Sequence, residues 1–474
     1  MTSRFAVAEH YEFGEASREA LESPNLQLAL SRLGETLAAG NRRAFEELPG
    51  SSLLRERARQ IKEESLSSLH EQLEMLERNV QQRGGVVHWA GDGKEACEIV
   101  ARIAAERGIH QIVKSKSMVT EEIHLNRHLE EAGYQVTETD FGEYIIQLAG
   151  ERPSHIVAPV VHKTIEEVAE LMNRKLDSDT AVDAKALAGL ARRTLRERFR
   201  TSEMGISGAN FAIVETGSVV IVSNEGNARL TTTVPRIHVA IVGIEKVIPR
   251  LQDLPVFLKI LARGATGQKI SVYTSLISGP RKEGEGDGPE EFHLILLDNG
   301  RSRILGTEMR ESLFCIRCGA CLNICPVYRK IGGHAYGGIY SGPIGAVLTP
   351  LYDGLKPNYH QPQASSLCGA CQAACPVKIR IPELLVKNRA GLQKLGAGSK
   401  VERWIYSAWG RLMRSPRLYG NLVWFSTRFV SRFAKGGWFR KMPGPVRGWT
   451  SVRDFPAPAS RSFRDRWDEI RRES

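Results

Sequence analysis

The sequence predicts an α/β domain that follows a helical segment and precedes a small cysteine-rich domain and a basic helical tail. Three observations lead to this fold class. Short apolar strands alternate with amphipathic helices over residues 85–305, seven of the eight cysteines fall within 315–375, and the excess of positive charge lies in 400–474. The chain has 474 residues, which is too long for one ordinary core. We therefore expect four parts, at residues 1–84, 85–305, 306–385 and 386–474.

The first part, residues 1–84, predicts helices without a chemical role. The stretch SSLLRERARQIKEESLSSLHEQLEMLERNVQQRGG has apolar residues at helical spacing and ends in two glycines, which stop helices. The initial MTSRFAVAEHYEFGEASREAL carries acids and lacks the apolar core of a secretory signal. No apolar run of about 18 residues occurs in the chain, so no spanning helix is predicted. We expect a cytoplasmic protein.

The second part alternates between strand and helix patterns. VVHWA, HQIVKSKS and YQVTETD predict strands, and GKEACEIVARIAAERG and TEEIHLNRHLEEAG between them predict helices. A helical stretch at 163–200 leads into a strand-rich region, in which SNEGNA predicts a turn between two strands, and FHLILLDNGRS predicts a last strand. Strand–helix–strand repetition predicts a parallel sheet covered by helices.

A few residues of this α/β domain are candidates for a site. Glu215-Thr216-Gly217-Ser218 and Asn224-Glu225-Gly226-Asn227 form either a pocket at strand ends or two tight turns. Lys114 and Lys116 follow a strand and either grip an anion or lie at a solvated strand end. Cys97 lies in a predicted helix and is interpreted as a small buried hydrophobe.

The third part opens with the run CIRCGACLNICP. Its cysteines are Cys315, Cys318, Cys321 and Cys325, and Pro326 follows. This spacing is that of bacterial ferredoxins with two [4Fe–4S] clusters, in which three cysteines hold one cluster and the fourth holds the other. Three thiolates on a tight loop reach three corners of one cube, while the next cysteine starts a helix that points elsewhere. A disulfide framework would instead spread its cysteines along a small secreted chain.

A second run, SSLCGACQAACP, repeats the first with one ligand missing. Aligned from the Cys-Pro end, Ser365 stands where Cys315 stood. Crossed ligation assigns Cys315, Cys318, Cys321 and Cys375 to cluster one, and Cys325, Cys368 and Cys371 to cluster two. The fourth iron of cluster two is then held by the Ser365 oxygen, held by water, or absent, which would give a [3Fe–4S] centre. A pair of zinc sites is the alternative, but seven cysteines at ferredoxin spacing favour iron–sulfur clusters.

Two such clusters limit what the chain can do alone. They move electrons one at a time and do not by themselves take a hydride from an organic substrate. No predicted strand is followed by GxGxxG, so the sequence gives no flavin or nicotinamide fingerprint. The motifs therefore predict an electron carrier between a substrate-oxidising partner and an acceptor, unless the α/β domain binds a cofactor that no motif reveals.

The fourth part is a basic tail rich in tryptophan. Residues 400–474 contain 17 Lys and Arg against 6 Asp and Glu, a net charge of +11 that equals the net charge of the whole chain. Six of the seven tryptophans are here: Trp404, Trp409, Trp424, Trp438, Trp449 and Trp467. Such helices could lie on an anionic membrane surface or clamp a partner protein. Nucleic acid binding has no fold or base-reading motif behind it, and we expect no nucleic acid partner.

These motifs resemble those of the lactate utilization protein B family, the iron–sulfur subunit of the bacterial L-lactate oxidation system. The resemblance covers most of the chain and rests on three stretches: CIRCGACLNICPVYRKIGGHAYGGIYSGPIGAV, SSLCGACQAACPVKIRIPELL and NFAIVETGSVVIVSNEGNARL. It implies that the α/β part is a LUD domain, similar in fold to the NagB/RpiA/CoA-transferase group, and that a dicluster ferredoxin-like α-helical domain follows. A three-cysteine second motif is normal in that family. The glutamate nucleophile of related CoA-transferase folds is not carried over to Glu215.

The same resemblance implies companions and a reaction. The family works with two companions, lactate utilization protein A, which is cysteine-rich, and lactate utilization protein C, which has a LUD domain of its own. Together they oxidise L-lactate to pyruvate. The expected function is therefore that of an electron-transfer subunit, located in the cytoplasm, with a peripheral position at the inner face of the membrane left open. Two alternatives stay open: a free-standing enzyme that transforms a small acid or acyl-CoA in the LUD-like domain, and a non-redox scaffold whose metal centres only hold the fold.

Overall fold

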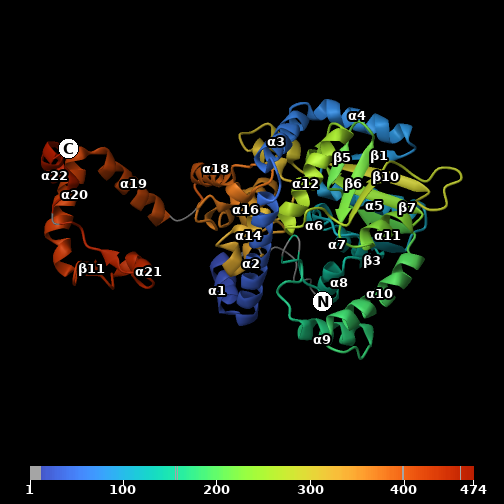
Figure 1. Ribbon diagram of the computed structural model, residues 1–474, viewed down its shortest axis with the longest axis horizontal. Helices are drawn as coiled ribbons and strands as arrows, with labels where there is room; N and C mark the ends of the chain where they lie inside the picture. The colour runs from blue at the N-terminus through green and yellow to red at the C-terminus, as the bar shows by residue number, and fades with distance from the viewer. Residues whose placement is uncertain (1–11, 155, 157, 398–399, 460, 474) are drawn as a thin grey trace. The chain divides into compact units, whose positions relative to one another are not determined.

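The structure is a computed structural model that describes residues 12–154, 156, 158–397, 400–459 and 461–473. Residues 1–11 of the predicted helical segment lie outside this range, as do 398–399, 460 and 474 of the predicted tail. The chain forms two compact units, one ending at Leu395 and one beginning at Gly396 (Figure 1). Each unit is described by itself.

The centre of the first unit is a six-stranded parallel sheet, as the strand–helix pattern predicts. Its order is β1 (Val86–Ala90), β10 (Glu291–Leu297), β7 (Ile237–Gly243), β4 (Met204–Ser207), β2 (Gln111–Lys114) and β3 (Gln135–Glu138). Every neighbouring pair is parallel. Because all six strands run the same way, their carboxyl ends gather at one edge, where ligand sites of such sheets lie.

Both faces of this sheet are covered, so its strands are apolar throughout. On β10, Ile295 and Leu297 pack with α5 (Gly93–Glu106) and α7 (Leu125–Glu131), while Leu294 and Leu296 belong to the core on the opposite face. That second core includes the helices α3 (Ser51–Ser67), α4 (Leu69–Gln82) and α12 (Leu254–Ala265) and a smaller sheet. The smaller sheet has the order β8 (Val247–Ile248), β5 (Phe211–Ile213), β6 (Ser218–Ser223) and β9 (Tyr273–Ile277).

Two local predictions in this domain are wrong. The stretch 120–133 is not one helix: α6 (Met118–Glu122) ends before His124, which adopts a left-handed backbone with φ 52°, and α7 starts after it. SNEGNA does not join two strands, because α11 (Asn227–Thr233) follows β6 before β7 begins. The helical stretch at 163–200 forms α9 (Ile165–Leu176) and α10 (Ala184–Thr201). These are changes of local continuity, and the α/β fold class is confirmed.

The N-terminal helices connect the α/β domain to the cysteine-rich domain. They are α1 (Phe13–Glu22), α2 (Pro24–Glu46), α3 and α4. Helix α2 packs against α12 of the α/β domain and against α14 (Ala320–Ile324) and α15 (Tyr328–Ile331) of the cysteine-rich domain. The Asn41 side chain donates to the Arg263 and Gly264 carbonyls at 3.0 and 3.2 Å, which satisfies exposed acceptors at the end of α12.

The cysteine-rich domain is helical and contains α14, α15, α16 (Gly342–Tyr352), α17 (Ala370–Ala374) and α18 (Ile381–Lys394). Helices α14 and α17 carry the two motifs and pack against each other. The boundary that the sequence places after residue 385 falls within α18. The four-part division of the chain stays a prediction.

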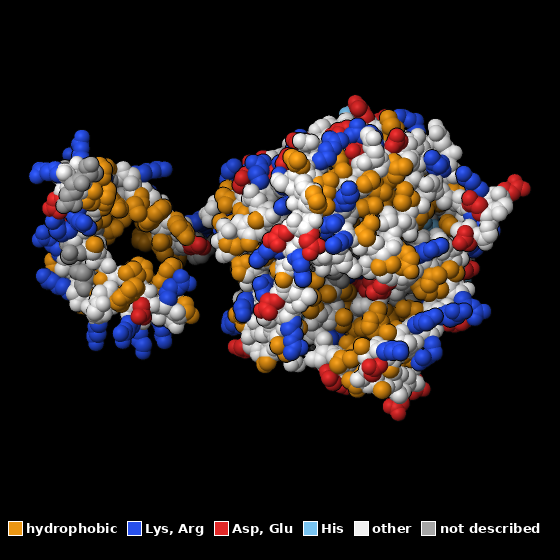
Figure 2. All heavy atoms as spheres, viewed as in Figure 1, with side chains coloured by type: hydrophobic (Ala, Val, Ile, Leu, Met, Phe, Trp, Pro, Cys, Tyr) orange, Lys and Arg blue, Asp and Glu red, His pale blue; other side chains and the backbone are white. Residues whose placement is uncertain are grey.

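The second unit contains the basic tail. Its main helices are α19 (Lys400–Arg414), α20 (Pro416–Arg428) and α22 (Phe463–Glu473), with a short antiparallel pair of β11 (Trp438–Phe439) and β12 (Phe455–Pro456). Figure 2 shows Lys and Arg side chains around this unit beside patches of hydrophobic side chains. Its six tryptophans are all at least 47% exposed. Over the described part of the chain, no helix has the length and apolar character to cross a membrane.

Candidate functional site: two cysteine groups

The two cysteine motifs have the same backbone conformation. Arg317 and Leu367, each just before a cysteine, have left-handed φ angles of 58° and 54°. Gly319 and Gly369 follow with φ 79° and 83°, and each opens a five-residue helix, α14 or α17. A positive φ is strained for Arg and Leu, so the same strain at the same place indicates that both loops are built for one purpose.

All eight cysteines are free thiols, and backbone N–H groups point at sulfurs in both motifs. Arg317 N donates to Cys315 Sγ at 3.4 Å, Tyr328 N to Cys325 Sγ at 3.5 Å, and Ile379 N to Cys375 Sγ at 3.3 Å. In the second motif, Leu367 N donates to Ser365 Oγ at 3.2 Å. The serine oxygen thus occupies the position in its loop that the Cys315 sulfur occupies in the first.

The thiols lie in two groups. Burial raises the pKa of Cys321, and the charges of Cys315, Cys318 and Cys375 raise it further, so these four thiols interact electrostatically. Burial likewise raises the pKa of Cys371 to about 12, and Cys325 and Cys368 add to the effect. Cys375 of the second motif thus interacts with thiols of the first motif, and Cys325 of the first motif interacts with thiols of the second.

The two groups differ in burial. Cys318, Cys321 and Cys375 are only 9%, 7% and 6% exposed, and Cys315 is half-buried. In the second group Cys371 and Cys325 are buried, but Cys368 is exposed and Ser365 is half-buried. The first group lies in the interior of the unit and the second reaches the surface.

Basic side chains surround the first group. Arg55 of α3 donates to the Ala373 and Cys375 carbonyls, both at 2.6 Å. Burial lowers the pKa of Arg55, and the nearby Cys375 and Cys318 sulfurs oppose that shift. Lys246, which follows β7, donates to the Cys315 carbonyl at 3.2 Å. Burial lowers the pKa of Lys246 to about 8. Arg317 lies within the Cys315–Cys318 loop itself, with its guanidinium 4.2 Å from the ring centre of Tyr340.

These features fit iron–sulfur clusters. Clusters of this kind are held by free thiolates, and hydrogen bonds to the sulfurs and nearby charge tune them. Hydrogen bonds to sulfur and nearby positive charge are both present around the motif cysteines. In the described part of the chain, no group of three or more His, Cys, Asp or Glu side chains is arranged to hold a metal ion. The assignment of individual ligands stays a prediction.

A buried network of charges lies behind the first group. Arg301 donates to both oxygens of Glu122 at 2.9 Å and to Glu245 Oε2 at 2.6 Å. Tyr340 donates to the same Glu122 at 2.5 Å. Burial would raise the pKa of Glu245, but Arg301 and Lys246 hold it down to about 2. The network ties β7 and β10 of the α/β domain to the segment between the two cysteine motifs.

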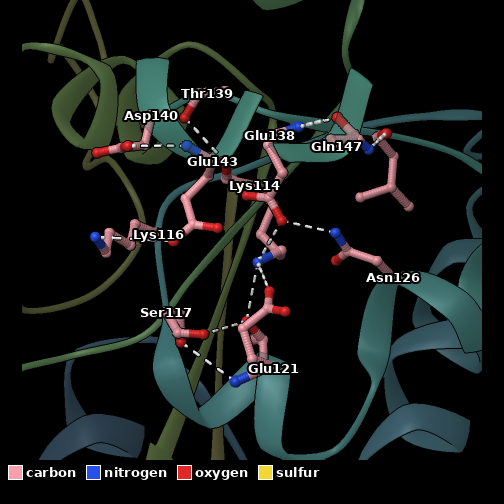
Figure 3. Close-up of polar contacts among 12 residues, drawn as sticks. Lys114, Lys116, Ser117, Glu121, Asn126, Glu138, Thr139, Asp140, Glu143 and Gln147 are labelled. Carbon is pink, nitrogen blue, oxygen red and sulfur yellow. Dashed lines mark hydrogen bonds and ion pairs between the residues drawn. The ribbon is translucent and has the colours of Figure 1, made fainter. Parts of the chain in front are cut away.

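Lys114, the last residue of β2, and Lys116, which follows it, have different surroundings (Figure 3). Lys114 is 1% exposed, and its Nζ lies 2.8 Å from Glu138 Oε1 and 3.2 Å from Glu121 Oε1. The prediction of a solvated strand end is therefore wrong for Lys114, whose charge is already matched by two carboxylates. Lys116 is half-buried, with Nζ 3.8 Å from Glu143 Oε1.

The two turns around β6 do not form one pocket. Glu215–Ser218 lead into β6 and Asn224–Asn227 leave it, so the strand separates them. Glu215 accepts a hydrogen bond from the Leu251 N–H at 2.8 Å, so its carboxylate makes a structural contact with the segment after β8. Asn224, Glu225 and Asn227 line a cavity that Glu215 does not reach. Cys97 is 2% exposed, as expected for a small buried hydrophobe.

Sequence reasoning missed the basic residues around the first thiol group. Arg55 lies in a helix for which no chemistry was predicted, and Lys246 follows a strand far from the cysteines in sequence. Arg317 alone had a local signal, because it stands inside the first motif where the second has Leu367.

Comparison with known proteins agrees with the geometry. A LUD domain model matches residues 73–297, a 4Fe–4S dicluster domain model matches 311–379, and a model for the C-terminal region of lactate utilisation protein B matches 388–471. Fold, thiol groups and these matches define the class: an iron–sulfur protein that joins a LUD domain to a dicluster domain.

Curated relatives then identify the family. The chain is 42% identical over 460 residues to lactate utilization protein B of Shouchella clausii, which covers 97% of both chains. The protein of the same name from Geobacillus kaustophilus is 44% identical, and the match covers 98% of both chains. The one from Bacillus subtilis is 43% identical, and the match covers 96% of this chain and 95% of that protein. This chain belongs to the lactate utilization protein B family.

One solved structure also matches. The crystal structure of a DUF162 family protein from Deinococcus radiodurans is 13% identical and covers 48% of this chain and 98% of its own, with a TM-score of 0.26. A similarity this slight carries no argument about the fold.

Proposed function

We propose that this chain is the iron–sulfur electron-transfer subunit of a complex that oxidises L-lactate to pyruvate. One observation carries the proposal: two ferredoxin-type cysteine motifs stand in a chain that aligns over nearly its whole length with lactate utilization protein B. The proposed companions are a cysteine-rich protein and a second LUD protein. The relatives' name, lactate utilization protein B, supports a system of several proteins.

Two clusters are proposed as cofactors, with crossed ligation. Cluster one takes Cys315, Cys318, Cys321 and Cys375. Cluster two takes Cys325, Cys368 and Cys371, and its fourth iron is held by the Ser365 oxygen, held by water, or absent. The grouping of the thiols supports this division, because Cys375 acts on Cys321 and Cys325 acts on Cys371. When bound, such clusters accept and release single electrons. The chain's own residues supply the thiolates, the N–H donors to sulfur, and the positive charge of Arg55, Arg317 and Lys246.

Reconstitution tests the function. The purified chain alone, loaded with iron and sulfide, is expected not to reduce an artificial dye with L-lactate, because it has no flavin or nicotinamide fingerprint. Adding the companion proteins is expected to give lactate-dependent dye reduction and pyruvate. The matched control is the complex assembled with a Cys318→Ser, Cys371→Ser double variant. Steady lactate oxidation by the homogeneous chain would favour the free-standing enzyme, and metal that is redox-silent in the full complex would favour a scaffold.

For the tail, we propose a contact with an anionic surface, either a membrane or a companion. Exposed tryptophans beside arginines support it, since Arg453 lies 4.5 Å from the Trp449 ring centre and Arg428 lies 5.3 Å from that of Trp424. Co-sedimentation with anionic and with neutral vesicles tests the membrane form of the proposal. Binding to neither, together with a stable complex with the companions, would assign the tail to a contact with a companion protein.

A further inference from the structure

A cavity of about 340 Å³ opens at the carboxyl ends of the parallel strands of the α/β domain. The residues that immediately follow the strands line it: Ser115 and Lys116 after β2, Asp140 after β3, Gly208 after β4, and Lys246 after β7. Open parallel sheets bind ligands at this edge, because the strand ends and the loops after them leave a crevice there. The volume lies within the range of small-molecule sites.

The cysteine-rich domain closes the other side of this cavity. Arg317 and Cys318 of the first motif line it, together with Tyr340. Helix α12 reaches the same thiol through Gly264, where a Cβ atom would lie 3.3 Å from Cys318 Sγ and 2.8 Å from Pro376. Glycine is the residue that allows this close approach. The cavity therefore lies between the α/β domain and the first thiol group, with a proposed cluster ligand in its wall.

The charged side chains that line the cavity are of both signs: Lys116, Lys246, Arg301 and Arg317 stand with Asp140, Glu225 and Glu245. Arg301 is paired with both Glu122 and Glu245, so it offers little positive charge to a ligand. Arg317 is held more loosely, with its Nη2 3.8 Å from Glu245 Oε1 and 3.3 Å from the Tyr352 hydroxyl.

Two buried atoms at this cavity have no hydrogen-bond partner among the described residues. One is Arg317 Nη1, on a side chain that is only 10% exposed. The other is Asn227 Oδ1, an acceptor on the opposite domain. An unpaired buried donor or acceptor costs free energy, and a guanidinium is the group best suited to grip a carboxylate. A ligand with a carboxylate and a hydroxyl or keto oxygen would satisfy groups of both kinds.

We propose that this cavity binds a small organic acid that carries a hydroxyl or keto oxygen next to its carboxyl group, with Arg317 as the carboxylate-binding residue. The inference rests on the proposed function, and it gives that function a substrate-class site on this chain, beside the first thiol group. Lys116 and Lys246 add positive charge to the walls. The proposal concerns binding alone and assigns no bond-breaking step to the chain.

Equilibrium dialysis of the full chain tests it, under anaerobic conditions and with iron and sulfide loaded. The probes are labelled L-lactate, pyruvate, acetate and inorganic phosphate. We expect one L-lactate or pyruvate per chain, weaker binding of acetate, and a shift in the EPR signal of one cluster when the acid binds. Retention by the purified chain of an organic cofactor that lactate does not displace would overturn the proposal, as would tighter binding of phosphate than of either acid.

The informative variant is Arg317→Leu, because Leu367 already adopts the same left-handed backbone in the second motif. We expect it to weaken acid binding at least about tenfold, the loss of one charged hydrogen bond, with iron content unchanged. Lys116→Met, remote from the cysteines in sequence, is expected to weaken binding about threefold. The control is Arg329→Leu, which removes the same charge from the same domain outside the cavity and is expected to bind normally.

Failure of this inference is distinguishable from failure of the proposed function. If neither acid binds the wild-type chain, or if both cavity variants bind normally, the cavity proposal is overturned. A changed cluster potential in Arg317→Leu with unchanged binding also overturns it, and assigns Arg317 to the cluster alone. In each case lactate-dependent reduction by the reconstituted complex can still hold. Acid binding without such reduction would reject the proposed function and keep the site.

Discussion

The two cysteine motifs share a backbone but not an environment. Both place a left-handed residue before a cysteine, a left-handed glycine after it and a five-residue helix next. The first is enclosed by the α/β domain and the N-terminal helices. Lys246 donates to the Cys315 carbonyl, and Arg55 donates to the Cys375 carbonyl. The second has Cys368 exposed and serine in place of the fourth cysteine.

This difference teaches that the loop and the environment are encoded separately. Loop geometry follows from spacing, glycine and Cys-Pro, which both motifs have. Burial and charge come from segments far away in sequence, such as α3 and β7. We expect the interior site to be the robust one and the surface site to be the labile one.

The largest expected effect comes from removing a crossed ligand. Cys375→Ser and Cys315→Ser are expected to damage the same cluster and to lower the iron content by about half, because both thiols lie with Cys321. Cys371→Ser is expected to damage the other cluster. EPR spectra and iron analysis of the three variants measure this. If Cys375→Ser spares the cluster that Cys315→Ser loses, the two-group comparison is wrong.

The next effect concerns the missing ligand. Brief exposure to air is expected to release one iron from cluster two and leave a [3Fe–4S] signal, because a serine oxygen is a poorer ligand for such a centre than a thiolate. Ser365→Cys should suppress the signal, since the Ser365 oxygen already accepts the N–H bond that a sulfur accepts in the first motif.

Ser365→Ala separates the two options for the fourth iron. It should hasten the loss if the serine oxygen is a ligand, and should change little if water or nothing fills the site. EPR after matched exposure of the three proteins measures the difference. Equal and complete stability of all three would point to another residue as the fourth ligand.

A smaller effect is expected at Glu311, which fastens both motifs to the N-terminal helices. Its carboxylate accepts hydrogen bonds from Arg59 at 2.8 Å and from Arg380 at 2.7 Å. Burial alone would raise the pKa of Glu311, but these two bonds lower it to about 2. The unfolded carboxyl titrates near ~4.3, so the stabilisation is complete above that pH and is lost as the pH falls toward 2.

Glu311→Gln is therefore expected to lower the free energy of unfolding by about 2 kcal/mol at pH 7, and by less as the pH falls below ~4. Anaerobic denaturant titrations of the wild type and the variant at several pH values measure the difference. The control is Glu383→Gln, whose 52% exposed carboxylate pairs with the same Arg380 at 3.1 Å and should matter little. Equal losses in the two variants would contradict the assignment.

The smallest effect concerns the charge beside the interior site. Arg55→Met removes a guanidinium close to Cys375 and Cys318, and electrons should then be harder to add there. We expect the reduction potential of cluster one to fall by an amount on the order of tens of millivolts, with cluster two unchanged. Arg57→Met is the control, since Arg57 is 44% exposed and pairs with Asp253 instead. A redox titration followed by EPR tests this. An equal shift in the reduction potentials of both clusters would contradict the assignment of Arg55 to cluster one.

Much of the chain could be predicted from local patterns. Strand and helix periodicity gave the parallel α/β domain, because alternation and amphipathicity are properties of short segments. The predictions failed where a single residue changed direction, as at His124, or where polar residues after β6 began α11. Lys114 was also misjudged, since its two carboxylate partners come from other elements.

The sequence by itself determined that two thiol-bearing loops exist and that one has a serine in place of the fourth cysteine, because cysteine spacing and Ser365 are local facts. Only the tertiary structure decided which loop is interior, which cations lie beside it, and that Arg317 and Cys318 close a cavity at the ends of the strands. The physical reason is that burial and electrostatic interaction depend on distance in space. Arg55, Lys246 and the first motif are far apart along the chain, and folding brings their charges together.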